Sequence, residues 1–179
     1  MVYDACRAYY EASVFKSALR ILGAELRVGD RSIIVGDVEV YCFDWDPACN
    51  RERFRRFVME HEPGTIFTYT IHSYTMLNTV AGARIKGLVF YRGGVDGATG
   101  NPISGPGRLT RHLGVDRSLH GSSICGGNRI VVARACSPLP PRLVRVSRRV
   151  GVRREPPAML RYYIPPRRLL EYCGVYGEV

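Results

Sequence analysis

The spacing of hydrophobic positions changes several times along the chain, from helical periods to the alternation typical of strands. Apolar residues at helical spacing predict a helix over 13–22, with Ser13 as its N-cap. Alternation of apolar and polar residues over 24–28 and 32–43 predicts two strands, joined in a hairpin around Gly29-Asp30. The chain is therefore expected to start with a helix followed by an antiparallel strand pair.

The rest of the chain predicts further short elements separated by glycine and proline. They are a charged helix over 50–61, strands over 65–74, 84–92 and 128–134, a short helix over 109–113, and a loop over 93–107. Over 142–168, nine arginines and one acid are interleaved with valines, which predicts a strand with one basic face. Mixed elements without an internal repeat indicate a single α+β domain, 1–179, with an antiparallel or mixed sheet.

The charge balance of the chain favours a polyanionic partner. Its 26 basic and 16 acidic side chains give a net charge of +10, and all basic residues except Lys16 and Lys86 are arginines. Nucleic acid is the obvious polyanion for such a surface, whereas a general bias of the source towards arginine would give the same composition. Charge alone leaves these two interpretations open.

Cysteine spacing and apolar runs exclude several classes of protein. The six cysteines contain no C-x-x-C pair, so we expect no metal; buried thiols are the expected state, with disulfides the alternative in a hyperthermophile. No stretch approaches 18 uninterrupted apolar residues, and the first ten residues lack the apolar block of a secretory signal. We therefore expect an intracellular protein, in the cytoplasm and nucleoid or in a nucleus, with no membrane association.

A carboxylate within an apolar and aromatic strand is the strongest candidate for chemistry. Strand alternation places Glu39, Tyr41 and Phe43 on one face. Aromatic neighbours would desolvate Glu39 and raise its pKa, as a general base that works near neutral pH requires. The alternative is a glutamate on an edge strand that faces water. The sequence contains no P-loop, no H-E-x-x-H pair and no G-x-S-x-G elbow that would indicate another chemistry.

Several short motifs follow one another along almost the whole chain. They are Arg7-Ala8-Tyr9-Tyr10 and Leu22-Gly23, Val38-Glu39-Val40-Tyr41 with Asp46-Pro47-Ala48, Pro63-Gly64-Thr65-Ile66-Phe67-Thr68-Tyr69 with Asn78, Gly105-Pro106-Gly107-Arg108-Leu109 with Leu113-Gly114-Val115, and Arg149-Val150-Gly151-Val152 with Leu160-Arg161-Tyr162-Tyr163. In this order they resemble the motifs of the alkyladenine (3-methyladenine, methylpurine) DNA glycosylases. The resemblance implies a curved sheet flanked by helices, and a DNA repair enzyme that flips damaged purines out of the duplex.

The resemblance also assigns roles in the hydrolysis of an N-glycosidic bond. Glu39 would activate the water that attacks the sugar C1′ of an alkylated or deaminated purine nucleotide. Arg92 would lie near that water, although Tyr91 competes for the same aligned position. No lysine except Lys86 lies near the motifs, which disfavours a Schiff-base lyase step. The implied enzyme is a monofunctional glycosylase without a cofactor.

Four further positions match the pocket that receives the extruded base. Tyr41 and Tyr69 would stack on its two faces, and Asn78 would oppose the exocyclic amino group of normal guanine. Asn50 stands where the family usually has a histidine that helps to recognise the base, and capping of the following helix is the alternative. These four residues form the predicted base-binding pocket.

The remaining implied contacts are with the DNA duplex. His72 or Tyr74 would fill the gap left by the base, in a segment one residue shorter than in the family. The predicted contacts with the DNA backbone are Arg108, Arg145, Arg149 and Arg161. The expected partner is double-stranded DNA that contains damaged purines, bound by a monomer. The alternatives are a non-catalytic nucleic-acid-binding module and a protein that recognises damage without cutting it.

Overall fold

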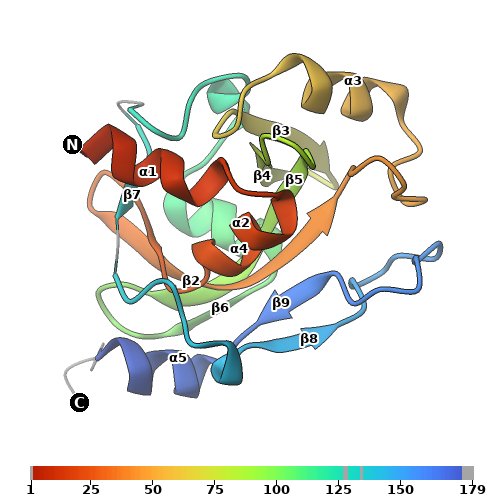
Figure 1. Cartoon of the computed structure of the whole chain (residues 1–179). Coiled ribbons are helices and arrows are strands. Elements are labelled where there is room, and N and C mark those ends of the chain that lie inside the picture. The colour runs from red at the N-terminus through yellow and green to blue at the C-terminus, as the bar shows by residue number, and fades with distance from the viewer. Residues whose placement is uncertain (1, 127–128, 134, 175–179) are drawn as a thin grey trace.

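The computed structural model describes residues 2–126, 129–133 and 135–174. The strands of this part are β1 (Glu25–Val28), β2 (Arg31–Tyr41), β3 (Ile66–Ile71), β4 (Tyr74–Ala81), β5 (Gly87–Asp96), β6 (Pro102–Ser104), β7 (Val131–Ala133), β8 (Arg145–Ser147) and β9 (Arg161–Tyr163). They form one curled antiparallel sheet in the order β3-β4-β5-β2-β1-β7, with β6 paired to β5, β9 to β2 and β8 to β9 (Figure 1). The α+β class is confirmed, and of the two expected sheet types the antiparallel one is present.

Five α-helices accompany the sheet in the described ranges. They are α1 (Val2–Tyr10), α2 (Val14–Ile21), α3 (Glu52–Glu60), α4 (Pro106–Leu113) and α5 (Pro166–Cys173). Both α2 and α4 pack on β2, β4 and β5, and Figure 1 shows α1 and α2 in front of the sheet. The hydrophobic pattern did not predict α1. Among the helices of this described part, none combines the length and the apolarity needed to cross a bilayer.

The first helix and hairpin predicted from periodicity are present. The Ser13 side chain accepts a hydrogen bond from the backbone N of Lys16 at 3.4 Å and so caps α2. Strands β1 and β2 pair from Glu25 opposite Ile34 to Val28 opposite Arg31. Local signals were sufficient here because the buried face of α2 and the alternation of β2 lie entirely within short windows.

The predicted strand over 65–74 is two strands of a hairpin. Strand β3 ends at Ile71 and β4 begins at Tyr74, so His72 and Ser73 form a two-residue turn. Both turn residues have positive φ, 45° and 71°, as the central positions of a type I′ turn require. The sequence lacks the asparagine or glycine that usually marks such a turn, so periodicity alone extended the strand through it.

About half of the predicted loop over 93–107 is ordered sheet. Strand β5 continues to Asp96, and Pro102–Ser104 returns beside it as β6. Glycine is required here by close backbone approach: a Cβ on Gly94 would lie 1.9 Å from the carbonyl oxygen of Ile34, and one on Gly93 would lie 2.4 Å from that of Ile103. The glycines were interpreted as loop formers, whereas in the structure they allow neighbouring strands to approach closely.

The arginine-rich tail is not one long strand with a basic face. It folds as the short strands β8 and β9, which pair with each other, while β9 also pairs with β2 from Asp37 to Glu39. In segment 148–160, which joins them, Arg149, Pro156 and Leu160 are buried, and the segment contains no strand. Within the predicted range 142–168, strand conformation is therefore present only at 145–147 and 161–163.

Two hydrophobic clusters divide the interior. The larger one joins α1, α2 and α4 to the central strands, and includes Tyr10, Ile21, Leu109 and Tyr91. The smaller one holds α3 against the ends of β3, β4 and β5, and its members are Cys42, Cys49, Phe57, Val58, Phe67, Val80 and Leu88. Tyr41, Phe54 and Tyr69 pack against the smaller cluster and are partly buried. This cluster therefore gives rigid support to three aromatic rings at one end of the sheet.

The cysteines are paired, so the expectation of buried thiols is wrong. Three disulfides are present, Cys6–Cys125, Cys42–Cys49 and Cys136–Cys173. The partners of the first pair are 119 residues apart, which a spacing pattern along the sequence cannot reveal. The second disulfide closes the loop that follows β2, at the end of the sheet where the aromatic rings gather.

Candidate active site

Glu39 is fully buried on β2 and is held by three polar neighbours. Its Oε2 accepts a hydrogen bond from the Tyr41 hydroxyl at 2.8 Å, and its Oε1 accepts one from the backbone N of Val150 at 2.8 Å. The Nε of Arg92 lies 3.4 Å from Oε1. Burial raises the pKa of Glu39, and this effect exceeds the lowering effects of the Arg92 charge and the two hydrogen bonds. A fixed carboxylate of raised basicity is suited to accept a proton.

Phe43 does not share the face of Glu39, contrary to the prediction from strand alternation. Strand β2 ends at Tyr41, and Cys42 has a φ of +56°, which turns the chain. Phe43 then packs in the larger cluster with its ring centroid 5.3 Å from that of Phe15. Desolvation of Glu39 comes instead from its complete burial within the sheet.

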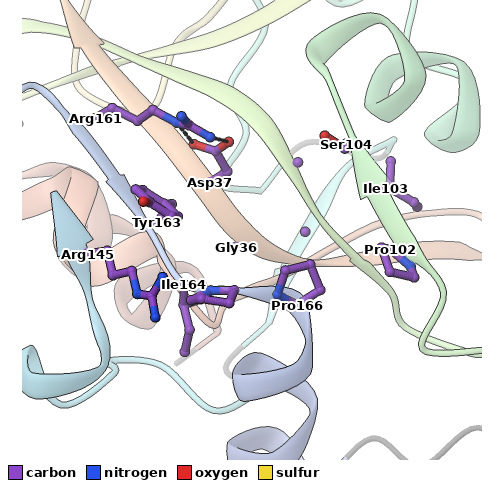
Figure 2. A pocket seen from close by; sticks show the side chains of 13 residues that line it. Gly36, Asp37, Pro102, Ile103, Ser104, Arg145, Arg161, Tyr163, Ile164 and Pro166 are labelled. Atoms are coloured by element: carbon purple, nitrogen blue, oxygen red, sulfur yellow. Dashed lines mark hydrogen bonds and ion pairs between the residues drawn. The ribbon is translucent and has the colours of Figure 1, made fainter. Parts of the chain in front are cut away.

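Arg92 projects from β5 between two carboxylates. Its Nε lies 3.8 Å from Oδ2 of Asp37 in addition to its approach to Glu39, and it has no hydrogen-bond partner among the described residues. Asp37 in turn accepts two hydrogen bonds from Arg161, at 2.9 and 2.7 Å (Figure 2). Positive and negative groups thus alternate from Arg161 to Glu39, which keeps a cation next to the buried glutamate.

Tyr91, the other residue aligned with the arginine position, belongs to the core. Its hydroxyl shares hydrogen bonds with Tyr10 at 3.0 Å and Thr79 at 3.1 Å. Adjacent residues of a strand point to opposite faces, so Tyr91 lies away from Glu39 and Arg92 lies towards it. The geometry therefore favours Arg92 at this position.

A cavity of about 240 Å³ lies next to Glu39, separated from it by Tyr41. The four residues predicted for the base-binding pocket all line this cavity, and they are Tyr41, Asn50, Tyr69 and Asn78. Burial raises the pKa of Tyr41 and the charge of Glu39 adds to this effect, so its hydroxyl stays protonated and donates to the carboxylate. The cavity thus combines aromatic walls with polar groups, and the Glu39 carboxylate lies behind Tyr41.

Asn78 is buried, and its amide is oriented by the backbone. Its Nδ2 donates a hydrogen bond to the carbonyl oxygen of Phe67 at 3.2 Å, across the β3–β4 hairpin. A buried amide without such a hydrogen bond would cost roughly 1–3 kcal/mol. The side chain is therefore fixed at the wall of the cavity.

Phe54 and Arg51 are among the lining residues that the sequence did not predict. Phe54 on α3 lies with its ring centroid 5.2 Å from that of Tyr69, and the Arg51 guanidinium lies 5.6 Å from the Phe54 centroid. The pattern over 50–61 indicated only a charged helix. Arg51, without a side-chain cap bond, is the N-cap of α3, so the alternative in which Asn50 caps this helix does not hold.

The two wedge candidates differ in their surroundings. His72 is exposed at the tip of the β3–β4 hairpin. Tyr74 is also exposed, at 38%, but its ring lies against α4: the Arg111 guanidinium lies 4.9 Å from its ring centroid, and a Cβ on Gly107 would lie 2.7 Å from its ring. The geometry favours His72 as the residue able to enter a duplex.

Arg149 is buried, so the prediction that it contacts the DNA backbone is wrong. Its guanidinium donates two hydrogen bonds to Asp46 at 2.8 Å, one to Glu155 at 2.9 Å and one to the carbonyl oxygen of Val40 at 2.9 Å. It also lies 4.4 Å from the centroid of the Tyr41 ring. All three nitrogens have acceptors inside the protein, because the residue joins segment 148–160 to β2.

The loop 42–49 at the edge of the cavity is fixed from several sides. Arg55 of α3 donates to the carbonyl oxygens of Cys49, Asp44 and Asp46 at 2.8 to 3.1 Å. The Asp46 carboxylate also accepts hydrogen bonds from the backbone N of Cys42 and of Ala48. Together with the Cys42–Cys49 disulfide, these contacts hold one wall of the cavity in place.

The other predicted backbone contacts divide into bound and exposed arginines. Arg161 is ion-paired with Asp37 and three-quarters buried, so its charge is largely satisfied within the protein (Figure 2). Arg108 and Arg145 are exposed. Arg148, Arg153 and Arg154 of segment 148–160 are also exposed, and they flank the backbone that binds Glu39. Apart from Arg51, which lines the cavity, the exposed arginines beside the Glu39 site therefore lie on this segment.

The chain is similar to a family of known proteins. A cavity with aromatic walls beside a buried carboxylate is the arrangement expected of an enzyme that acts on an extruded nucleobase. The family model described as "Methylpurine-DNA glycosylase (MPG)" matches residues 8–168. A relative from Methanoculleus marisnigri named "Putative 3-methyladenine DNA glycosylase" is 31% identical over 183 residues, which cover 90% of this chain and 95% of the relative. Relatives with the same name are 29% identical in Chlorobaculum tepidum (72% of this chain, 69% of the relative) and 34% identical in Enterococcus faecalis (49% and 46%).

The chain therefore belongs to the methylpurine-DNA glycosylase family. It is a DNA glycosylase of DNA repair, and its substrate is DNA. The matched region spans both the buried glutamate and segment 148–160, so the elements that surround the cavity all lie within it.

Proposed function

We propose that the protein hydrolyses the N-glycosidic bond of an alkylated or deaminated purine in double-stranded DNA with a water activated by Glu39. The observation that carries this proposal is the buried carboxylate of raised pKa beside a cavity walled by Tyr41 and Tyr69. Extrusion of a base from a duplex costs a few kcal/mol, which aromatic stacking offsets. Two rings at the cavity wall supply such contacts.

The proposed step needs only water and the residues present. A water oxygen forms a bond to C1′, its proton passes to Glu39, and the C1′–N bond breaks with its electron pair on the purine. Positive charge develops on the sugar in the transition state, so an ionised Glu39 also stabilises that charge. The buried Nε of Arg92 lies 3.4 Å from Oε1 of Glu39 and has no hydrogen-bond partner among the described residues, so Arg92 would orient the water beside the carboxylate.

A lyase step through a Schiff base is not part of the proposal. The residues that line the cavity include no lysine. Lys86 donates its Nζ hydrogen bonds to the carbonyl oxygens of Met59 and His61, at the end of α3. The protein should therefore leave an abasic site and not a cleaved strand.

The direct test is release of free base from defined substrates. Single-turnover reactions use duplex oligonucleotides that carry hypoxanthine or ethenoadenine, and duplex DNA that contains 3-methyladenine. Release of a damaged purine with an intact strand supports a monofunctional glycosylase. Tight binding of damaged DNA without release of any base would instead identify a damage-recognition protein.

Shortening Asn78 should weaken the discrimination against normal guanine. Its fixed amide occupies the cavity wall, and removal of that bulk makes room for the exocyclic N2 amino group. For Asn78→Ser we expect faster excision of guanine relative to hypoxanthine in single-turnover assays. A variant that melts earlier but keeps the same ratio of hypoxanthine to guanine excision would assign Asn78 a structural role only.

Neutralising exposed arginines of segment 148–160 should reduce the salt dependence of DNA binding. Each phosphate contact contributes about −0.9 to the slope of log affinity against log salt concentration. For the double variant Arg148→Gln with Arg153→Gln, we expect the slope to flatten by roughly two. The matched control neutralises Arg27 of β1 and Arg31 of β2, in the β1–β2 hairpin, which should leave the slope unchanged. Equal slopes for both pairs would show that this segment does not contact phosphates.

A further inference from the structure

Arg51 brings a positive charge to the wall of the base cavity. It is exposed and lines the cavity together with Asn50, Phe54 and Tyr69. Its guanidinium lies 5.6 Å from the Phe54 centroid, and it acts electrostatically on the Tyr69 hydroxyl, opposing the rise in pKa that burial causes there. The charge is therefore felt inside the cavity and not only in the surrounding solvent.

No acidic side chain among the cavity-lining residues compensates this charge. The nearest buried carboxylate, Glu39, lies behind Tyr41 and is already paired with Arg92. Asp46, in the loop that borders the cavity, is bound by Arg149. Cys42 and Cys49, which also line the cavity, form a disulfide and do not ionise. A base that enters this cavity meets aromatic faces, amides and one uncompensated guanidinium.

We propose that Arg51 is a specificity-determining residue that directs the enzyme towards uncharged purine lesions with acceptors on their major-groove edge, and away from cationic methylated purines. This inference rests on the proposed function of the same cavity. Near a protein surface, two like charges a few ångströms apart repel by an energy equivalent to about tenfold or more in rate, so an uncompensated guanidinium disfavours a cationic base. The guanidinium thus makes the net charge of the base a selection criterion.

The chemistry of departure strengthens this selection. When the C1′–N bond of an uncharged purine breaks, the electron pair of the bond stays on the purine. The purine therefore departs as an anion, which takes up a proton afterwards. A nearby guanidinium stabilises that developing negative charge. A cationic purine becomes neutral as it leaves, so Arg51 gives its departure no such assistance and opposes its entry.

The geometry of a guanidinium suits one class of uncharged lesion in particular. Arginine donates two parallel hydrogen bonds to the O6 and N7 acceptors of guanine, and hypoxanthine presents the same two acceptors. Hypoxanthine lacks the N2 amino group that Asn78 is proposed to exclude. Arg51 and Asn78 would then examine different edges of the base, which separates hypoxanthine from adenine, guanine and cationic lesions.

The test compares two substrates with one pair of matched variants. Second-order rate constants are measured below saturation for release of hypoxanthine from a duplex oligonucleotide and of 3-methyladenine from methylated duplex DNA. For Arg51→Gln we expect the ratio of hypoxanthine to 3-methyladenine release to fall about tenfold or more. The control is Arg53→Gln, because Arg53 lies 5.2 Å from the same Phe54 centroid but does not line the cavity. It should leave the ratio unchanged.

Other outcomes separate this inference from the proposed function. Arg51→Lys keeps the charge but loses the paired donors, so it should retain low 3-methyladenine release and lose part of the hypoxanthine release. An equal loss on both substrates in Arg51→Gln, or a ratio equal to that of Arg53→Gln, would overturn the inference while leaving the glycosylase reaction intact. Absence of base release by the unmodified protein would instead contradict the proposed function. Binding of hypoxanthine-containing duplex in an Glu39→Gln background provides a second measurement, in which Arg51→Gln should weaken affinity more than Arg53→Gln.

Discussion

Replacement of Glu39 by Gln is expected to abolish base release while leaving the fold and the binding of damaged DNA intact. A glutamine keeps the volume of the side chain and can accept the hydrogen bond from the Val150 backbone N, while its amide donates to the Tyr41 hydroxyl oxygen. It cannot take a proton from water, so the single-turnover rate should fall by roughly 10²–10⁴-fold or more. Near-normal turnover of this variant would remove Glu39 from the mechanism.

The same substitution should change the dependence on pH in a defined direction. Burial holds the pKa of Glu39 above its ordinary value of 4.5, and the reaction needs the ionised form. The rate of base release by the unmodified protein should therefore rise as pH increases through that raised pKa, and Glu39→Gln should lack this rise.

A carboxyl with a raised pKa in the folded state stabilises the protein below its unfolded pKa, and this stabilisation is lost as pH rises through the folded pKa. At neutral pH, Glu39→Gln should therefore unfold at a temperature equal to or above that of the unmodified protein. A clear loss of stability would show that the ionised carboxylate is mainly structural.

Replacement of Arg149 by Met is expected to destabilise the protein and to impair base release together. The substitution leaves the buried carboxylates of Asp46 and Glu155 without their cation and removes the support behind the Tyr41 ring. Breaking a buried ion pair from one side typically costs about 3–5 kcal/mol, because the remaining charge stays desolvated. Chemical denaturation should show a loss of this size.

The matched control for Arg149 is Arg145→Met, an exposed arginine on β8. Surface substitutions of this kind usually change stability by less than about 0.5 kcal/mol. A variant in which Asp46→Asn and Glu155→Gln accompany Arg149→Met should recover part of the stability, because no buried charge is left unpaired. Similar unfolding curves for Arg149→Met and Arg145→Met would contradict an internal role for Arg149.

Short-range patterns predicted those parts of the fold whose causes are local. The buried face of α2, its Ser13 cap and the β1–β2 hairpin each depend on a few neighbouring residues, and all are present. The glycines at 93 and 94 misled the prediction, because what requires them is the backbone of strands far away in sequence. A glycine-rich segment has the same local composition in a loop and at a close approach of two strands, so composition does not distinguish the two.

The candidate site was predictable mainly through the order of motifs. Alternation singled out Glu39, but the assembly of Tyr41, Asn50, Tyr69 and Asn78 around one cavity came from the resemblance and not from periodicity. Arg149 shows the limit of a pattern, since an arginine between the exposed residues Arg148 and Val150 has no local mark of burial. Its partners Asp46 and Glu155 lie on segments that meet only in the folded chain. Arg51 was missed because the pattern over 50–61 predicts only a charged helix and does not show that Arg51 and Phe54 line the cavity.

The hydrogen bond from the Val150 backbone to Glu39 joins residues 111 positions apart, and it has a consequence for the order in which the protein becomes competent during synthesis. A nascent chain that has emerged only as far as β7 already contains every aromatic wall of the cavity. It lacks the amide that orients the carboxylate and the guanidinium that supports the ring of Tyr41. Chains that terminate prematurely should therefore have no glycosylase activity on DNA, because the groups that orient Glu39 and support Tyr41 belong to the last quarter of the chain.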